Sequence, residues 1–423
     1  MKTTIMNSRT TTRAAAATVV FTLTAGLTAC GGEGSTEGAE AGTSATSESP
    51  AEETVEPAQS TVESFPVGAP FGQAVWSVDV GAGEKTVFVR PDRVFVDNLN
   101  LDTRTIHAYT SEGAEAWTYE LPDHEYPENA KIGVFDETVA VLEQVETEAS
   151  GLDTASTVTR LTALSQEDGS VVAEEEIPSD ALSINGFGSV VYWGEGEDTL
   201  NFVTETGEIV DVEAPDTQPN KAGFVDGIPF WVDRASHVNT ASWSSREDLG
   251  LDQSEFIGAE VLAVDNRQGL LVLQVSSGVG VDRSYYGVRA ETGEVVYELS
   301  CPGYSHSDSQ TDIARNSPNG EYGVLESIWM SADEGQCFGG EDGQRSVELI
   351  AVDDNGTAYG DAALGSGGSD ELVVIPAGGE PEVSEGPTPV GIMNGDIAVH
   401  VNGSRTEGTS FTGATTISGN PIE

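Results

Sequence analysis

One short pattern recurs along most of this chain and limits the folds that it can adopt. It is a β-rich run, a turn with acidic residues and one glycine, and a second β-rich run. Its five copies place the turn glycine at Gly113, Gly169, Gly207, Gly293 and Gly356. A hairpin loop of three to five residues needs one residue at positive φ, which glycine adopts without steric cost. The recurrence therefore predicts a series of similar β-hairpins.

The spacing of these glycines predicts the size of the repeating unit. Successive intervals are 56, 38, 86 and 63 residues, and the longest fits two units with a degenerate copy at about 224–250. Periods of about 40–50 residues are typical of propellers and solenoids. Residues 64–423 therefore predict an all-β domain, a β-propeller of about seven four-stranded blades, or alternatively eight. Short β-branched and aromatic runs support this prediction at 86–89, 93–96, 139–142, 189–193 and 270–275.

The copies resemble the repeats of quinoprotein-type (PQQ-like) β-propellers, in which an Ala-Thr-Gly turn precedes a strand that closes on tryptophan. Thr206-Gly207-Glu208 and Thr292-Gly293-Glu294 match best, and the outer-strand tryptophan occurs in one copy, as Trp117. Residues 317–322, Ser-Pro-Asn-Gly-Glu-Tyr, are similar instead to the turn of WD40-like repeats. The resemblance covers most of residues 85–364 and implies a propeller scaffold. A pair of β-sandwiches is the alternative, because it also has short strands and glycine turns.

The first 30 residues have the three parts of a secretory signal peptide. Lys2, Arg9 and Arg13 precede an apolar segment at 14–29, and Cys30 follows it. The Leu-Thr-Ala-Cys ending resembles the lipobox of bacterial lipoproteins. The resemblance implies cleavage before Cys30, attachment of two acyl chains such as palmitate, and anchoring on the outer face of the cell membrane. The alternatives are an ordinary signal peptide and an uncleaved membrane anchor, but a span needs about 20 apolar residues.

The sequence thus predicts three segments, a signal peptide at 1–29, a linker at 30–63 and the propeller domain at 64–423. Apart from Val55 and Val62, the linker consists of small, polar, acidic and proline residues, and it contains no aromatic residue. Such a composition cannot bury enough apolar surface to offset the entropy of ordering, and its like charges extend it. We expect a disordered acidic tether that holds the folded domain away from the membrane.

Cysteine parity predicts a disulfide. The chain has 3 cysteines, and lipidation of Cys30 would leave Cys301 and Cys337 with one possible intramolecular pairing. Disulfides persist in oxidising compartments outside the cytoplasm. Two free buried thiols are the alternative.

The charge of the chain limits its partners. The formal net charge is -53, and loss of the signal peptide would leave 15 basic residues against 71 acidic ones. Nucleic acids and anionic lipid headgroups are bound through Lys and Arg, so the composition argues against both as partners of the folded domain. Cations, basic proteins and neutral ligands remain open. Few lysines with abundant Asp, Glu, Gly and Ala suggest an actinobacterial origin.

No catalytic or cofactor signature is visible. The chain has no Gly-x-Ser-x-Gly elbow, no P-loop, no adjacent cysteines as in enzymatic quinoproteins, and 5 histidines without metal-ligand spacing. Residues 123–125, Asp-His-Glu, read as a solvated loop. Residues 353–356, Asp-Asp-Asn-Gly, superficially match a calcium loop but coincide with a hairpin turn. We therefore expect no catalytic residue, no metal and no cofactor.

Two functional hypotheses remain, together with a minor third. The first is a lipid-anchored, non-catalytic module with a monomeric ectodomain that binds a protein or a wall component. The second is a propeller enzyme, either a degenerate quinone-dependent dehydrogenase or a glycan hydrolase with paired carboxylates. The third is a calcium-stabilised structural protein.

We also expect the strand at 74–80 to pair with strands at about 395–401 or 410–417, because this pairing removes an exposed edge.

Overall fold

The structure is a computed structural model, and the residues that it describes lie within one compact unit, Ala58–Glu423. The described residues are 65–423 except 101–102, 122–129, 136, 148–155, 178–183, 186–188, 194–198, 204–208, 214–220, 234–235, 241, 246–255, 278–282, 302–313, 341–344, 363–370 and 408.

The described residues form an all-β fold of antiparallel sheets, and six of these sheets are simple meanders of consecutive strands. Three come first, namely β6–β9 (Lys131–Val134, Thr138–Thr147, Ser156–Ser165, Val171–Ile177), β10–β13 (Ile184–Asn185, Ser189–Trp193, Thr199–Val203, Ile209–Glu213) and β14–β16 (Lys221–Val225, Ile228–Val232, Val238–Thr240). Three follow, namely β17–β20 (Phe256–Asp265, Leu270–Ser277, Arg283–Arg289, Val295–Ser300), β21–β24 (Arg315–Asn316, Tyr322–Leu325, Ile328–Ser331, Gly335–Cys337) and β25–β28 (Val347–Val352, Ala358–Ala362, Glu371–Ile375, Glu382–Glu385).

A larger sheet joins the two ends of the domain. It contains β1–β5 (Trp76–Gly81, Glu84–Val89, Arg93–Leu99, Arg104–Thr110, Glu115–Glu120) and β29–β31 (Gly391–Met393, Ile397–Glu407, Ser410–Pro421). Its order is β29-β30-β31-β2-β3-β4-β5, and β1 also pairs with β31. The long β31 serves both neighbours, because Thr412 lies opposite Glu84 in β2, whereas Gly419 lies opposite Trp76 in β1. The expected pairing of the first strand with the C-terminal region is confirmed.

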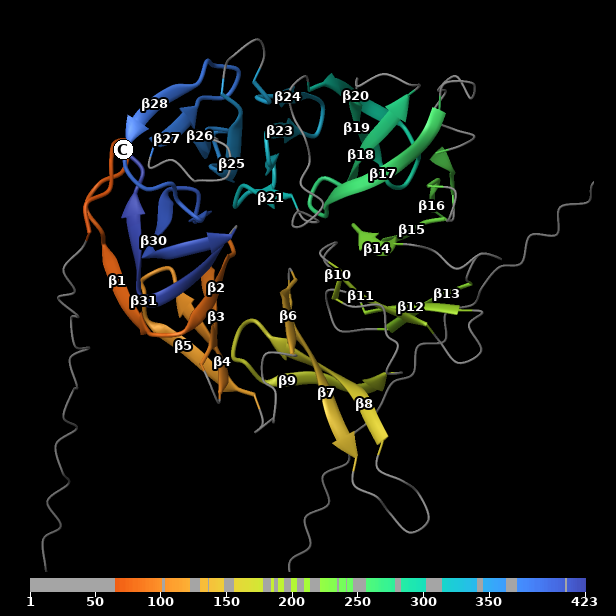
Figure 1. Ribbon diagram of the computed structural model, residues 1–423, viewed down its shortest axis with the longest axis horizontal. Helices are drawn as coiled ribbons and strands as arrows, with labels where there is room; N and C mark the ends of the chain where they lie inside the picture. The colour runs from red at the N-terminus through yellow and green to blue at the C-terminus, as the bar shows by residue number, and fades with distance from the viewer. Residues whose placement is uncertain are drawn as a thin grey trace, which may run out of the picture. The chain divides into compact units, whose positions relative to one another are not determined.

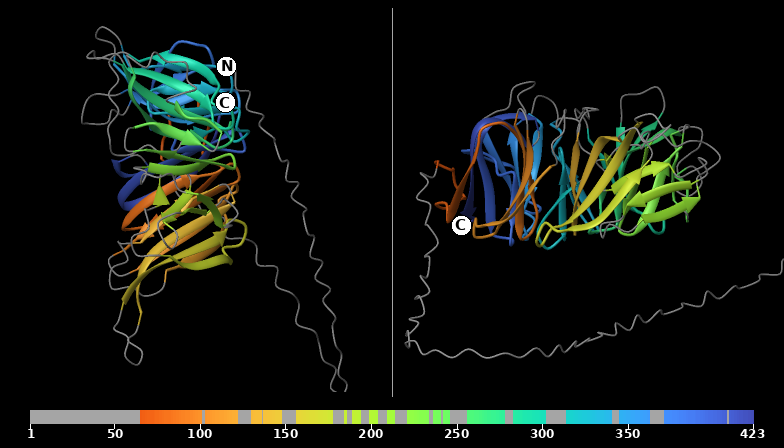
Figure 2. Two further views of the ribbon diagram at one scale, coloured as in Figure 1. Left: turned by 90° about the vertical axis from the view of Figure 1, so that its right-hand side faces the viewer. Right: turned by 90° about the horizontal axis from the view of Figure 1, so that it is seen from below.

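The sheets follow one another in chain order around a common centre (Figures 1 and 2). Neighbouring sheets touch through their first strands, as β6 touches β10, β14 touches β17 and β21 touches β25. The first strand β29 touches both β25 and β2. Consecutive four-stranded meanders with their first strands innermost are typical of a β-propeller. All five β-rich runs predicted from the sequence are strands, in β2, β3, β7, β11 and β18.

The core lies in the layers between sheets. One layer packs Phe95 and Trp117 against Val139 and Leu164 of the next sheet, and all four side chains are buried. A second layer joins the sheet β14–β16 to β17–β20 in the same way. Because each sheet has two apolar faces, its strands contain near-continuous buried runs, such as residues 270–273 in β18.

The turn glycines belong to two different turns. Gly113, Gly169 and Gly293 lie between the last two strands of their sheets, at β4–β5, β8–β9 and β19–β20, whereas Gly356 lies between the first two strands of its sheet, β25 and β26. Gly207 lies outside the described residues. Assigning Gly356 to the same series of turns was wrong. A short hairpin between the first two strands of a sheet needs the same acidic residues and positive-φ glycine as one between the last two, so the sequence does not distinguish them. The degenerate copy expected at about 224–250 contains the three-stranded sheet β14–β16.

Tryptophans explain why two of these turns are occupied by glycine. A Cβ added to Gly169 would lie 2.8 Å from the Trp117 ring, and one added to Gly293 would lie 2.8 Å from Trp243. Each tryptophan comes from the preceding sheet and donates its Nε1–H to the next sheet, Trp117 to the Gln166 carbonyl at 2.9 Å. Glycine therefore serves both the positive φ and the close approach of an aromatic ring.

Candidate functional site

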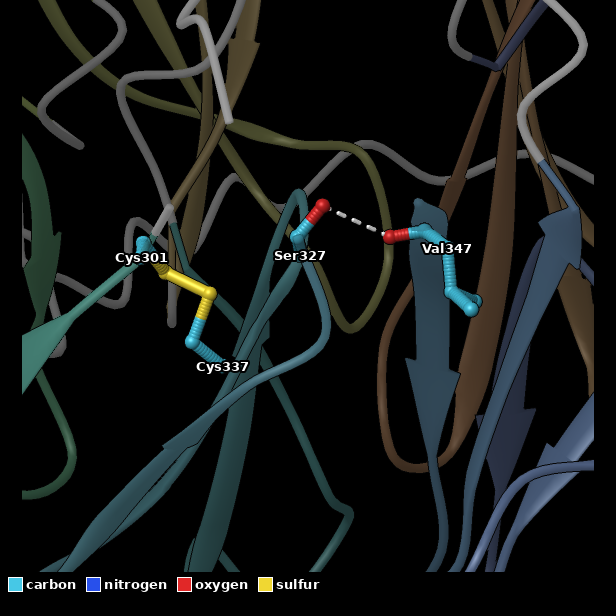
Figure 3. Close-up of a disulfide and its surroundings, with 4 residues drawn as sticks. All are labelled: Cys301, Ser327, Cys337 and Val347. Atoms are coloured by element: carbon cyan, nitrogen blue, oxygen red, sulfur yellow. Dashed lines mark hydrogen bonds between the residues drawn. A yellow bond between two sulfur atoms is a disulfide. The ribbon is translucent and has the colours of Figure 1, made fainter. Parts of the chain in front are cut away.

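A disulfide fixes one edge of the junction between sheets β17–β20 and β21–β24. Cys301 follows β20 and Cys337 ends β24, and the two residues are bonded with a Cα–Cα distance of 5.7 Å (Figure 3). The predicted pairing is therefore present. Beside it, the Ser327 hydroxyl donates to the Val347 carbonyl of the next sheet at 2.8 Å. The bridge thus braces the β22–β23 turn, which contains Glu326 and Ser327.

A cluster of charged side chains lies at the same edge of the domain as the β22–β23 turn. In antiparallel meanders the starts of first strands and the ends of second strands meet at one edge. That edge gathers five charged residues from three neighbouring sheets, namely Arg315 in β21, Glu326 after β22, Glu348 in β25, Asp361 in β26 and Arg405 in β30. We call these five residues the edge cluster.

Arg405 is the centre of the ion pairs in the edge cluster. Its Nη1 lies 2.6 Å from Asp361 Oδ2, and its Nη2 lies 3.8 Å from Glu348 Oε1. The Thr388 hydroxyl also donates to the Asp361 carboxylate. Asp361 is buried, whereas the Glu348 side chain is 55% exposed. The cluster therefore extends from a buried carboxylate, Asp361, to one in solvent, Glu348.

Two members of the edge cluster have perturbed protonation. Burial, and then the nearby Glu348 carboxylate, raise the pKa of Glu326 to about 7. Burial, and then the nearby Arg405 guanidinium, lower the pKa of Arg315 to about 10. Arg315 donates to the Ile350 carbonyl of the next sheet at 3.1 Å. Near neutral pH the cluster can therefore exchange a proton at Glu326 while Arg315 stays charged.

Most described basic side chains link neighbouring sheets. Guanidinium groups donate to a backbone carbonyl of the following sheet in the pairs Arg90–Val134, Arg104–Ala130, Arg267–Pro318, Arg289–Ala332 and Arg315–Ile350. Lys85, 1% exposed, donates to the Gly83 and Gly413 carbonyls at 3.0 and 2.8 Å. These groups are committed to main-chain oxygens, so the few bases of the chain hold the fold together.

The outermost strands carry the opposite charge. β5, β9, β20 and β28 contain no basic residue, and their exposed glutamates are Glu115, Glu120, Glu174, Glu175, Glu176, Glu298, Glu382 and Glu385. Exposed valines accompany them at Val171, Val172, Val295 and Val383. Acidic residues on an open strand edge oppose edge-to-edge association between copies. They also give the rim of the domain a negative potential.

The other residues singled out in the sequence have structural roles or lie outside the described residues. Cys30, the signal peptide at 1–29, the linker at 30–63 and the triplet at 123–125 lie outside them. Asp353 accepts the backbone N–H groups of Asn355 and Thr357, both at 2.9 Å, and its carboxylate therefore closes the hairpin turn. Among the residues that the structure describes, no three His, Cys, Asp or Glu side chains are grouped to hold a metal ion.

Sequence reasoning missed the edge cluster because its members come from four strands and a turn without a shared motif. One local signal was available at Glu326. It is the single acid between the apolar strands β22 and β23, and its φ is +49°, a value that non-glycine residues rarely adopt.

Within the part of the chain that is described, no helix has the length and apolarity to cross a membrane.

Comparisons with known proteins show similarity in structure only. No profile of a known protein family and no curated protein matches the chain. BamB from Moraxella catarrhalis is 12% identical, with 81% of this chain and 100% of that chain covered and a TM-score of 0.40. Virginiamycin B lyase from Staphylococcus aureus is 11% identical, with 82% and 99% covered and a TM-score of 0.36. The WD40 repeats of RRP9 are 8% identical, with 85% and 100% covered and a TM-score of 0.37.

Proposed function

We propose that this chain is a lipid-anchored, extracytoplasmic binding module that recognises a basic protein or a basic component of the cell envelope without turnover. The observation that carries the proposal is the separation of charge within the folded domain. Five described arginines donate to a carbonyl of the following sheet, whereas exposed glutamates lie on the outermost strands β5, β9, β20 and β28. A surface of this kind attracts cationic partners and repels nucleic acid and anionic headgroups.

The proposed scaffold is an eight-bladed propeller. The eight-stranded sheet divides into one blade of β2–β5 and one of β29, β30, β31 and β1, which with the six meanders makes eight. The Asn394 N–H donates to the Pro91 carbonyl at 2.7 Å, which joins the first turns of these two blades. In this arrangement the N-terminal strand completes the last blade.

The proposed anchor is Cys30, and the proposed spacer is the acidic linker at 31–63. The Leu-Thr-Ala-Cys ending supports the anchor. Cell fractionation of the parent and of Cys30→Ala tests it, with the variant expected in the soluble extracytoplasmic fraction. If the variant stays with membranes as fully as the parent, the anchor is assigned wrongly.

The binding proposal is tested by crosslinking in intact cells. A photoreactive residue in place of Val172, on the acidic outer strand β9, is expected to capture a partner with a basic surface. Gln in place of Glu174, Glu175 and Glu176 should reduce the capture, and added salt should reduce it further because exposed charges are screened. The same photoreactive residue in place of Lys131, in the inner strand β6, is the control.

The alternative is a propeller enzyme, and the edge cluster is the observation that favours it. Glu326 and Glu348 are neighbouring carboxylates, and the raised pKa of Glu326 suits a general acid at neutral pH. The purified chain is therefore assayed for a bound quinone, for calcium-dependent stabilisation and for hydrolysis of generic glycosides. Turnover that is lost in Glu326→Gln would replace the binding proposal with the enzymatic one.

A further inference from the structure

The segment before and within β1 lies along the last strand of the domain. We call residues 68–81 the strap. Its backbone bonds to β31, with Gly72 N–H donating to the Pro421 carbonyl and Val75 N–H to the Gly419 carbonyl, both at 2.8 Å. The strap contains β1, so it covers the edge of β31 that would otherwise be open.

A histidine is buried beneath the strap. His400 in β30 is 0% exposed, and its ring meets Phe71 of the strap edge to face, with 4.6 Å between ring centroids. Phe71 also contacts Tyr359 of the neighbouring sheet at 5.4 Å. Neither His400 Nδ1 nor Nε2 has a partner in hydrogen-bond geometry among the described residues. The strap thus encloses a polar ring, which has Phe71 on one side and lies near the Asn420 side chain and the backbone at Ala398 and Pro387.

The strap leaves further polar atoms without partners. Trp76 Nε1 and Ser77 Oγ are buried and have no hydrogen-bond partner in the described part of the chain. By contrast, Trp117, Trp243 and Trp329 each donate Nε1–H to a carbonyl of the next sheet, at 2.7 to 2.9 Å. A buried polar group without a partner destabilises the folded state by its desolvation free energy, because it has lost its hydrogen bonds to water. The group forms those hydrogen bonds again when it is exposed. Detachment of the strap would therefore return the hydration of these atoms.

We propose that the strap is an acid-operated latch, in which protonation of His400 in mildly acidic surroundings releases residues 68–81 from β31 while the remaining sheets stay folded. Burial lowers the pKa of His400 to about 4 when the strap is closed, opposed by Asn420 and by the backbone at Ala398 and Pro387. Once exposed, the imidazole has its ordinary pKa of about 6.5. The open form therefore binds the proton more tightly, and acidification from pH 6.5 toward 4 favours opening.

Other titratable groups near the strap do not replace His400 in this role. The Tyr359 hydroxyl donates to Asp353 at 3.0 Å, and burial with the nearby Asp353 raises the pKa of that phenol, so it stays neutral. Glu423 Oε1 lies beside the strap at Gly72. No carboxylate contributes to the pKa shift of His400. An imidazolium formed there would have no counter-ion to hold the strap in place.

Hydrogen exchange of the full chain between pH 7 and 4.5 tests the latch, with rates corrected for the pH dependence of chemical exchange. The protection of β1 is expected to fall by up to about a hundredfold relative to that of β18, since each pH unit below 6.5 gives up to a factor of ten. His400→Phe keeps an aromatic ring against Phe71 and should abolish this change, whereas the control His107→Phe should keep it.

Three results would overturn the proposal. They are unchanged protection of β1 in the parent, equal loss in β1 and β18, and the same loss in His400→Phe as in the parent. If His400→Phe does not fold, His400→Leu takes its place, and the comparison of β1 with β18 in the parent still decides whether the strap opens locally.

Discussion

Two junctions of this domain show different ways of joining neighbouring sheets. At the seam, β31 pairs with β2 and β1 through main-chain hydrogen bonds, and His400 and Trp76 are buried without polar partners in the described part. At the junction of β17–β20 with β21–β24, a disulfide, two arginine–carbonyl bonds and the buried Tyr297 make the connection. The seam joins the chain ends without a covalent bond, by strand pairing, by apolar packing and by side-chain hydrogen bonds such as Lys85 to the Gly413 carbonyl, whereas the second junction is also held covalently.

The two junctions also differ in the sign of their response to pH. Asp265, at the second junction, is 0% exposed, and burial raises its pKa to about 6. Its Oδ1 accepts the Gln268 N–H at 3.0 Å and the Asn316 side-chain amide at 2.6 Å. Acidification neutralises a buried charge at Asp265 but creates one at His400. The seam should therefore weaken in acid while the second junction gains stability.

The largest effect is expected from removing β1. Deletion of residues 31–63 should leave the free energy of unfolding nearly unchanged, because these residues precede the described fold. Deletion of 31–80 exposes the edge of β31 and removes the buried Trp76, and loss of a buried tryptophan alone costs about 3–5 kcal/mol. Urea denaturation measures both truncations. Equal stability of the two would show that the seam contributes nothing.

Breaking the disulfide is expected to come next. The double variant Cys301→Ser and Cys337→Ser should lose about 3–4 kcal/mol, since the bridge closes a loop between residues 36 apart. Reducing agent should destabilise the parent by a similar amount and leave the variant unchanged. A parent that is insensitive to reduction would mean that packing alone holds this junction.

Asp265→Asn sharpens the contrast in pH dependence. The carboxyl has a pKa of about 6 in the folded state against an ordinary value of about 3.9, so folded molecules hold the proton more tightly. The stability that this proton provides is complete below about pH 4 and is lost as the pH rises through 6. The variant should remove this slope and gain up to roughly 3 kcal/mol at pH 7. An unchanged stability profile from pH 4 to 7 would contradict the assignment.

The smallest expected effect is a difference in the loss of stability between two tryptophan variants. Trp117→Phe and Trp76→Phe remove the same part of a buried indole, but only Trp117 loses a hydrogen bond, to Gln166. Trp117→Phe should therefore cost about 1 kcal/mol more. Thermal unfolding of both variants measures the difference, and a larger loss at Trp76 would show that the seam is better satisfied than its contacts indicate.

The sequence by itself predicted five strands, the hairpins at Gly113, Gly169, Gly293 and Gly356, and the pairing of Cys301 with Cys337. These depend on short-range chemistry, because β-branched runs, a glycine at positive φ and cysteine parity can be read without knowing distant neighbours. The pairing of the first strand with the last was also predictable, because an unpaired edge strand is a liability. The position of Gly356 within its sheet was not, since turns at both places use the same residues.

Only the tertiary structure decided which side chains share a site. The edge cluster brings together Arg315, Glu326, Glu348, Asp361 and Arg405, which span 91 positions of the chain and follow no common spacing. The burial of His400 beneath Phe71 likewise joins residues more than 300 positions apart. The charge, pKa and hydrogen bonding of these groups depend on burial and on neighbours in space, and the antiparallel stacking of sheets supplies both.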